Sequence, residues 1–250
     1  KLIYITGIGT SESHARYLEY IFSKNNVKYV PLSTFYDNNF TCQDSYVILI
    51  SQGLSPNTNI IFEKYNYKNI ILLSAVTNNN MNHNKVLILK KLKNNNCPIM
   101  TYPIEDEYST LIRIIGPMCG YILCYKLGTK LKLIPKLQKS GRTDLYNICN
   151  NIELLIPNDL FITNLIKYKR ICIVYNNRIK YYIKHIVDKF IEGVFLNKVT
   201  SSDFFEFSHG IFQNIEHVRI NDNKLTNILI IKTCDSDNGY ISNINKMLNN

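Results

Sequence analysis

Several patterns are missing from this sequence, and each absence removes a class of protein. No apolar run approaches the roughly 20 residues that a membrane-spanning helix needs, and no signal peptide opens the chain. The seven cysteines form neither a Cys-x-x-Cys pair nor the Cys/His spacing of a metal site, and most have apolar neighbours. Tryptophan is absent, and no run of Lys and Arg has the length of a nucleic-acid-binding tail. We therefore expect a cytoplasmic protein with reduced, buried thiols, no membrane segment and no metal.

The composition that is present suits a large folded core. The chain has 250 residues, of which 46% are hydrophobic, and a formal net charge of +10. About an eighth of the residues are Asn, and Lys, Ile and Tyr are also abundant, as in proteins from A/T-rich genomes. The charge has two explanations, a polyanionic partner or drift toward Lys on solvated faces, and the dispersed basic residues favour drift. Nucleic-acid binding is therefore the weaker hypothesis, while phosphorylated small molecules remain compatible with the charge.

Short, continuously apolar segments alternate with helical patterns along the first half of the chain. The segments expected to be strands are residues 2–5, 27–31, 46–50, 69–74 and 99–103. Residues 86–89 fit either a strand or a short helix, and a long apolar helix is expected over 105–126, kinked by Pro117. Continuous apolar strands that alternate with helices indicate a parallel sheet buried on both faces.

The second half repeats this alternation after a basic, proline-bearing segment at residues 128–139. We therefore expect two domains, 1–128 and 129–250. In the second domain we expect strands at 171–175, 194–199 and 228–232, and helices at 144–151, 179–192 and 201–212. Gly193 is expected to cap the middle helix, and Ser201 or Ser202 to open the last. Because only about 20 residues follow the last strand, this domain is expected to be truncated or degenerate.

Two loops rich in hydroxyl groups follow strands of the first domain. Residues 6–11 contain two glycines before a helix, and residues 51–58 follow the strand 46–50. Glycine and the N–H groups of a helix N-terminus allow an anion to approach, and ligands bind at the carboxyl ends of parallel strands. The first loop alone is more often a mere tight turn, but two such loops predict a phosphate pocket without arginine. Its candidate residues are Gly9, Thr10, Ser11, Ser51, Gln52, Gly53, Ser55 and Thr58.

These loops resemble those of the sugar isomerase (SIS) domain family, in a divergent form. Gly9-Thr10-Ser11 matches the first loop of the family, and Ser51-Gln52 matches the start of its Ser-Gln-Ser-Gly-Glu-Thr loop. The sequence departs at residues 53–57, where Ser55 or Thr58 would replace the missing hydroxyls. The resemblance, which includes the isomerase half of glutamine–fructose-6-phosphate amidotransferase, implies two SIS-like three-layer α/β/α subdomains, each with a mainly parallel sheet. It also implies a phosphorylated sugar as ligand, a homodimer, and neither a metal nor an organic cofactor.

Two motifs of the second half stand in the order that this family has. They are Lys189-Phe190-Ile191-Glu192 and Glu206-Phe207-Ser208-His209-Gly210, with one extra residue between them and Ile211 in place of a proline. The resemblance implies that Glu192 moves a proton between C1 and C2 through an enediol, that His209 opens the sugar ring, and that Lys189 stabilises the enolate oxygen. The predicted reaction is therefore aldose–ketose isomerisation of a hexose phosphate, with or without an amino group.

Each of these residues also has an ordinary interpretation. Lys189 and Glu192 would form a solvent-facing pair on a helix, and His209 would be a core histidine among phenylalanines. The family's glutamate before Lys-x-x-Glu is His185 here, and its Gly-rich opening is replaced by residues 175–178. These departures favour the alternative function, a non-catalytic sugar-phosphate sensor or regulatory binding module.

Two further sites offer acid or base groups near the expected pocket. They are residues 105–107, which are Glu, Asp and Glu, and His14. The carboxylates fit the first turn of a helix, where they would interact with its dipole. His14 would either reach a sugar or lie on the surface.

Overall fold

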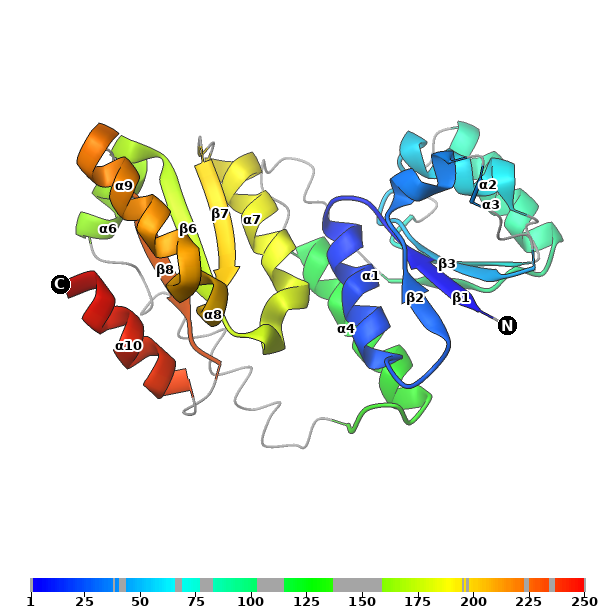
Figure 1. Cartoon of the computed structure of the whole chain (residues 1–250). Coiled ribbons are helices and arrows are strands. Elements are labelled where there is room, and N and C mark those ends of the chain that lie inside the picture. The colour runs from blue at the N-terminus through cyan, green and yellow to red at the C-terminus, as the bar shows by residue number, and fades with distance from the viewer. Residues whose placement is uncertain are drawn as a thin grey trace. The chain divides into compact units, whose positions relative to one another are not determined.

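The computed structural model contains two compact units, Lys1–Pro135 and Lys136–Asn250, which are described separately (Figure 1). The residues that the structure describes are 2–37, 39–40, 44–65, 69–76, 83–102, 115–136, 159–194, 196, 198–222, 225–233 and 237–249.

The first unit is built on a five-stranded parallel sheet. Its strands are β1 (Ile3–Thr6), β2 (Val27–Tyr29), β3 (Tyr46–Ile50), β4 (Ile70–Ser74) and β5 (Ile99–Thr101), in the order β2-β1-β3-β4-β5. Its helices are α1 (Thr10–Ile21), α2 (Asn59–Lys64), α3 (His83–Asn94) and α4 (Ile115–Lys130), with 3-10 turns at Leu32–Tyr36 and Pro56–Thr58. The chain runs outward from β1 to β2 and then returns to β3 on the other side of β1. The order of strands therefore reverses between β1 and β3, which is where such sheets bind ligands.

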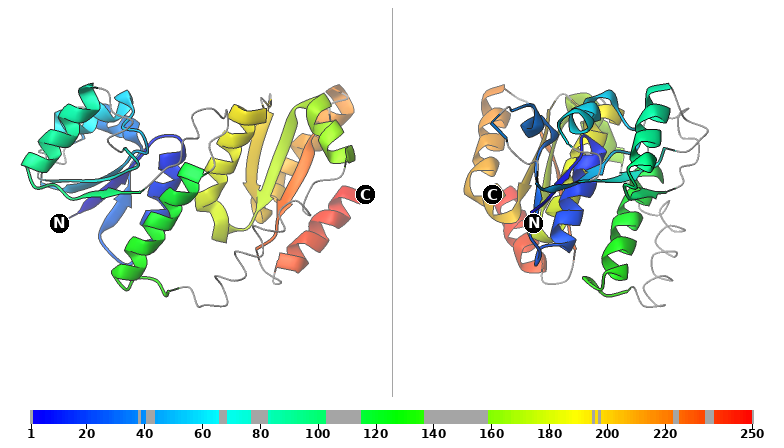
Figure 2. Two further views of the ribbon diagram at one scale, coloured as in Figure 1. Left: turned by 180° about the vertical axis from the view of Figure 1, so that it is seen from behind. Right: turned by 90° about the vertical axis from the view of Figure 1, so that its right-hand side faces the viewer.

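Both faces of this sheet are covered by helices (Figures 1 and 2). Alternate residues of β3 enter different cores: Leu49 packs with Ile61 of α2 and Leu92 of α3, and Ile48 packs with Leu18 of α1 and Cys124 of α4. Because both sets of side chains are buried, the strand reads as a continuous apolar run.

The second unit has a three-stranded parallel sheet in the order β7-β6-β8. The strands are β6 (Arg170–Tyr175), β7 (Lys198–Asp203) and β8 (Asn227–Ile231). One face is covered by α6 (Asp159–Tyr168) and α7 (Lys180–Val194) around Ile171 and Ile173. The other is covered by α8 (Phe204–Glu206), a π-helical segment (Phe207–Ile211), α9 (Phe212–Asp222) and α10 (Asn238–Asn249), around Cys172 and Val174. The predicted fold class, α/β with helices on both faces of parallel sheets, is confirmed.

Some boundaries differ from those predicted. Strand β7 begins at Lys198 and not at Val194, because α7 continues through Gly193, which therefore does not cap it. The predicted helix start at Ser201 or Ser202 lies inside β7, and Asp203 caps α8 instead, its Oδ1 accepting from the N–H of Phe205 at 2.8 Å and of Glu206 at 3.1 Å. Residues 86–89, left open above, belong to α3. Residues 105–107 and 144–151 lie outside the described residues.

Three of the four cysteines among the described residues have the buried environment that was predicted. Cys97, Cys124 and Cys172 are buried, Cys119 is half-buried, and none of these four forms a disulfide within the described part of the chain. Burial raises the pKa of Cys124 to about 12. Within the described parts of the chain, no helix is long and apolar enough to cross a membrane, and no cluster of three His, Cys, Asp or Glu side chains is placed to hold a metal ion.

Candidate functional site

The loop after β1 turns tightly around two glycines. Gly9, just before α1, has φ of 59°, a left-handed conformation that glycine adopts at little cost. A Cβ atom on Gly7 would lie 2.4 Å from the carbonyl oxygen of Ser11, so no larger residue fits without moving the backbone. The N–H of Ser11 donates to Ile8 O at 3.2 Å and that of Glu12 to Gly9 O at 2.9 Å. The glycines therefore bring the first turn of α1 against the end of β1.

The loop after β3 is held by its own polar groups. Thr58 is fully buried, and both its N–H and its Oγ1 donate to the carbonyl oxygen of Ser55, at 2.9 and 2.6 Å. Ser51 is also buried, and its N–H donates to Leu73 O in β4 at 3.0 Å. Thr58 thus stabilises the turn at Ser55, while Ser51 stands where β3 ends.

The two predicted loops meet in the structure. The N–H of Gln52 donates to the buried Ser11 Oγ at 3.4 Å, a contact between residues 41 positions apart. The carbonyl oxygen of Gln52 accepts from Ser74 Oγ at 3.3 Å and from the N–H of Ala75 at 3.0 Å. The end of β4 and the residue after it therefore support the second loop. Ser74 was missed as a site residue in the sequence analysis, although it is the polar residue that ends an apolar strand.

The side chain of Gln52 extends toward α4. A Cβ atom on Gly116, in the first described turn of that helix, would lie 2.4 Å from Gln52 Nε2. The amide of Gln52 therefore lies directly against the helix at Gly116, and a larger residue there would displace it. The predicted helix over 105–126 is observed from Ile115 onward, and its earlier residues lie outside the described part of the chain.

Two buried hydroxyls in the loops have no hydrogen-bond partner among the described residues. They are Thr6 Oγ1 at the end of β1 and Ser55 Oγ in the second loop. Unmet buried polar groups are costly and uncommon, so such groups indicate a place for water or a ligand. Neither loop contains Lys or Arg. An anion here would be held by hydroxyl and N–H donors rather than by a cation.

His14 has a different role from either of those expected. It is fully buried, its Nε2 lies 2.8 Å from Pro117 O of α4, and its ring meets Tyr121 edge-on with centroids 4.4 Å apart. A Cβ atom on Gly120 would lie 2.5 Å from the ring. His14 therefore joins α1 to α4, and both the sugar-contact and the surface interpretation are wrong.

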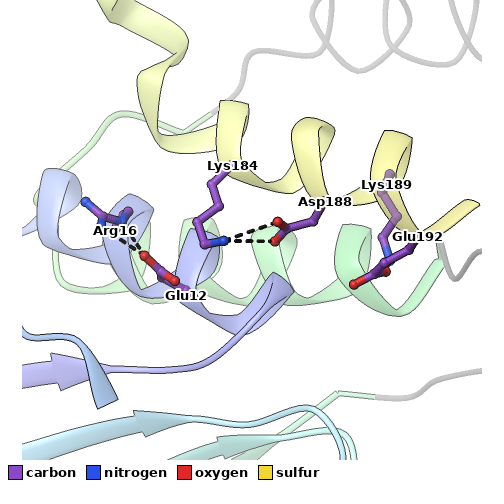
Figure 3. Close-up of polar contacts among 6 residues, drawn as sticks. All are labelled: Glu12, Arg16, Lys184, Asp188, Lys189 and Glu192. Carbon is purple, nitrogen blue, oxygen red and sulfur yellow. Dashed lines mark hydrogen bonds and ion pairs between the residues drawn. The ribbon is translucent and has the colours of Figure 1, made fainter. Parts of the chain in front are cut away.

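In the second unit, charged side chains follow one another along α7 (Figure 3). Lys189 Nζ lies 2.9 Å from Glu192 Oε2, and the side chain of Glu192 is 56% exposed. One turn earlier, Lys184 Nζ lies 3.2 Å from Asp188 Oδ1. The structure thus brings Lys189 and Glu192 together as their spacing predicts. Figure 3 also shows the pair Glu12–Arg16 of α1, in the first unit, at 2.9 Å.

His185 lies one turn before Lys189 on α7. Burial and, next, the ammonium of Lys189 lower the pKa of His185 from its ordinary 6.5, while Asp188 and Glu192 oppose that shift. His185 is therefore biased toward the neutral form at a position where the sugar isomerase family has a carboxylate.

This environment predicts a pH dependence of stability. A histidine with a lower pKa in the folded than in the unfolded state binds fewer protons when folded, so stability should fall as pH falls from about 6.5 toward the folded pKa. In His185→Gln, urea unfolding between pH 7.5 and 5.5 should show a smaller fall. His217→Gln, which replaces an exposed histidine of α9, should behave like the unmodified chain. An undiminished dependence in His185→Gln would contradict the assignment.

His209 stands on the π-helical segment with its side chain exposed. Its neighbours Phe204 and Phe207 are buried in the core, while Phe205 is 67% exposed. The interpretation of His209 as a core histidine is therefore wrong, although that of the phenylalanines as core residues is largely right. The described contacts pair Lys189 with Glu192 and leave His209 on a separate element.

The two units together define a double-domain α/β protein whose hydroxyl-rich loops meet at the point where the first sheet reverses its strand order. This is the fold of phosphosugar isomerases of the sugar isomerase type, as the loops predicted. The C-terminal domain of glucosamine-fructose-6-phosphate aminotransferase from Francisella tularensis matches with a TM-score of 0.65 and 13% identity, over 99% of this chain and 69% of that one. Tagatose-6-phosphate ketose/aldose isomerase from Escherichia coli matches with a TM-score of 0.63 and 16% identity, over 94% and 71%. No protein-family model matches the sequence, and no curated protein matches it.

Proposed function

We propose that this chain binds a phosphorylated sugar through the loops after β1 and β3. The observation that carries the proposal is the contact of Gln52 with Ser11, which brings together two loops rich in hydroxyl and N–H donors. The unmet hydroxyls of Thr6 and Ser55 add donors in the same loops. A phosphate group accepts hydrogen bonds from such donors, and the N-terminus of α1 favours its charge. The similarity in fold to glucosamine-fructose-6-phosphate aminotransferase and tagatose-6-phosphate ketose/aldose isomerase supports a sugar phosphate as the ligand.

The proposed reaction is aldose–ketose isomerisation of a hexose phosphate. Glu192, as carboxylate, would take the proton from one carbon of the open-chain sugar and return it to the neighbouring carbon, with an enediol between the two steps. His209 would transfer a proton to the ring oxygen so that the sugar ring opens, and Lys189 would stabilise the negative oxygen of the enediolate. The exposure of His209 supports its role, and the 2.9 Å pair of Lys189 with Glu192 brings these two side chains together, as both the catalytic and the ordinary interpretation of the pair require. We therefore propose a division of labour between the two predicted domains: residues 1–128 bind the phosphate group, and residues 129–250 supply the groups that isomerise the sugar.

The alternative is a sugar-phosphate sensor without turnover. It is supported by His185 at the place of the family's glutamate and by residues 53–57, which depart from the family's second loop. A thermal-shift screen of sugar phosphates would detect ligand binding in either case. Isomerisation of a stabilising ligand, followed by NMR, would separate the enzyme from the sensor. Stabilisation by nucleic acid, sensitive to salt, would instead support the third hypothesis of nucleic-acid binding.

Ser51→Ala tests the phosphate-binding loops. Removing a hydroxyl that bonds a charged group should weaken sugar-phosphate binding by about 1 to 3 kcal/mol, which is roughly a 5- to 150-fold rise in Kd. The measurement is isothermal titration calorimetry. Ser23→Ala, which replaces an exposed serine after α1, is the matched control and should bind normally. Unchanged affinity in Ser51→Ala would remove this residue from the site.

The homodimer expected from the family resemblance remains a prediction. In such proteins a histidine of the neighbouring subunit completes the site, and we expect the aromatic-rich segment 204–212 to pack at that interface. Light scattering at micromolar concentration should therefore give twice the chain mass. A fully active monomer would contradict a shared site.

A further inference from the structure

A cavity of about 520 Å³ lies in the second unit, apart from the motif residues of α7 and the π-helical segment. It is lined by residues that follow all three strands of the sheet. After β6 come Asn176, Asn177 and Arg178, at the end of β7 lie Asp203, Phe204 and Phe205, and after β8 come Asp237 and Tyr240. Because the strands are parallel, their carboxyl ends meet at one edge of the sheet (Figure 1). The cavity therefore occupies the edge where α/β sheets bind ligands, and its volume suits a small molecule.

The floor of the cavity is a polar network that is already in place. Asp237 is only 3% exposed, and Asn176 Nδ2 donates to its two carboxylate oxygens at 2.9 and 2.8 Å. The N–H and Oγ1 of Thr233 donate to Asp237 Oδ2 at 2.8 and 2.9 Å. Asn176 Oδ1 in turn accepts from the N–H of Arg178 at 2.9 Å. A buried charge with several donors around it is fixed in position, so the floor is preorganised.

One wall of the cavity is aromatic and partly open to solvent. Phe204 stacks on Tyr240 with centroids 5.5 Å apart and an angle of 26°. Phe205 meets the same tyrosine at 5.2 Å and 76°. Phe205 is 67% exposed and Tyr240 is 41% exposed. Such rings offer an apolar face beside the carboxylates and amides of the floor.

The charged residues that line the cavity favour some ligands over others. Among the described residues that line the cavity, Asp203 and Asp237 carry carboxylates and Arg178 a guanidinium, so their balance is negative. Carboxylates accept hydrogen bonds from hydroxyl and ammonium groups, and the amides of Asn176 and Asn177 both donate and accept. A phosphate would meet repulsion from the carboxylates, in contrast to the loops of the first unit, which contain no acidic side chain until Glu12.

We propose that this cavity is a second ligand site that binds an unphosphorylated sugar ring, with a hexosamine preferred over a neutral hexose. The C–H face of the sugar would lie on Phe205 and Tyr240, and its hydroxyl and ammonium groups would bond Asp203 and the floor. This proposal goes beyond the proposed isomerase or sensor function and does not depend on it.

The test is calorimetric titration of the whole chain with glucosamine, glucose and glucosamine 6-phosphate. Ser51→Ala serves as the background, so that binding in the first unit is already weakened. Glucosamine should saturate the protein with a Kd of about 10 mM or lower, and glucose should bind more weakly. Phe205→Ala should raise the Kd for glucosamine roughly 5- to 10-fold, the usual worth of an aromatic contact. Ile220→Ala, which shortens another exposed side chain of the second unit, is the matched control and should leave the Kd unchanged.

Asn177→Ala keeps the proposal testable if Phe205→Ala does not fold, because Asn177 is exposed and its loss removes only a polar contact. It should raise the Kd for glucosamine at least 3-fold. Three outcomes would each overturn the proposal: no saturation by glucosamine, a Kd for glucosamine that both cavity variants leave unchanged from the Ser51→Ala background, or tighter Phe205-dependent binding of the phosphorylated sugar. The loss of sugar-phosphate binding in Ser51→Ala is scored separately, so failure of the proposed function would be recognised on its own.

Discussion

Replacing Glu192 by Gln should lower turnover of the sugar phosphate by roughly 100-fold or more, the usual worth of a positioned general base. The amide has the size of the carboxylate and cannot accept a proton from carbon. The affinity for the sugar phosphate should therefore persist while the reaction stops. The measurement is deuterium exchange at C2 of a hexose 6-phosphate in heavy water, followed by NMR.

The matched control for this variant is Glu216→Gln. Glu216 also forms an ion pair three residues along a helix, with Arg219 at 2.6 Å, and lies on α9 of the same unit. Loss of an exposed pair of this kind costs little, so its turnover should be normal. Exchange that persists in Glu192→Gln would assign the base elsewhere, with Glu105 and Glu107 as the next candidates. If the unmodified chain gives no exchange with any sugar phosphate it binds, the sensor function is favoured.

Gly7→Ala should destabilise the first unit and weaken sugar-phosphate binding at the same time. The new Cβ would lie 2.4 Å from a backbone oxygen of Ser11, so the first turn of α1 must move away from the end of β1. An extra methyl group forced into a well-packed site lowers the free energy of unfolding by about 1 to 3 kcal/mol. Since the same shift moves Ser11 away from the N–H of Gln52, sugar-phosphate binding should weaken by about tenfold or more, roughly the loss of one hydrogen bond to a charged group.

Gly53→Ala separates crowding from the mere loss of a glycine. A Cβ atom at Gly53 meets nothing within 4 Å, so its free energy of unfolding in urea should change little. A stability of Gly7→Ala equal to that of Gly53→Ala would show that the first loop can relax. The tight turn would then not be required for the site.

The sequence was most informative where local chemistry and burial agree. Strands β3 and β4 could be predicted because they are continuous apolar runs in the sequence. Helices cover both faces of the first sheet, so the side chains on either face of these strands are apolar. The two loops were predicted because glycines and hydroxyls cluster where β1 and β3 end. Strand β7 was misplaced because it lies at the edge of the second sheet and carries polar residues along Lys198–Asp203, whereas Val194, where the strand was predicted to begin, is the last residue of α7.

Contacts between distant residues were beyond the sequence analysis. The bond of His14 to Pro117 O joins residues 103 positions apart, and no neighbouring residue indicates a buried histidine. The cavity floor was missed for a similar reason, because Asn176, Thr233 and Asp237 meet only when β6 and β8 pair. Each of these residues is ordinary in a loop when it is considered alone.

The direction in which His209 points depends on the number of residues in the π-helical segment. Helix α8, this segment and α9 follow one another without a break from Phe204 to Asp222. A π turn holds one residue more than an α turn, and each residue turns an α-helix by about 100°. Loss of one residue here would give a regular helix and rotate His209 relative to the helix that follows it. One residue more or fewer in this turn would therefore point His209 in another direction without any change in the side chain itself.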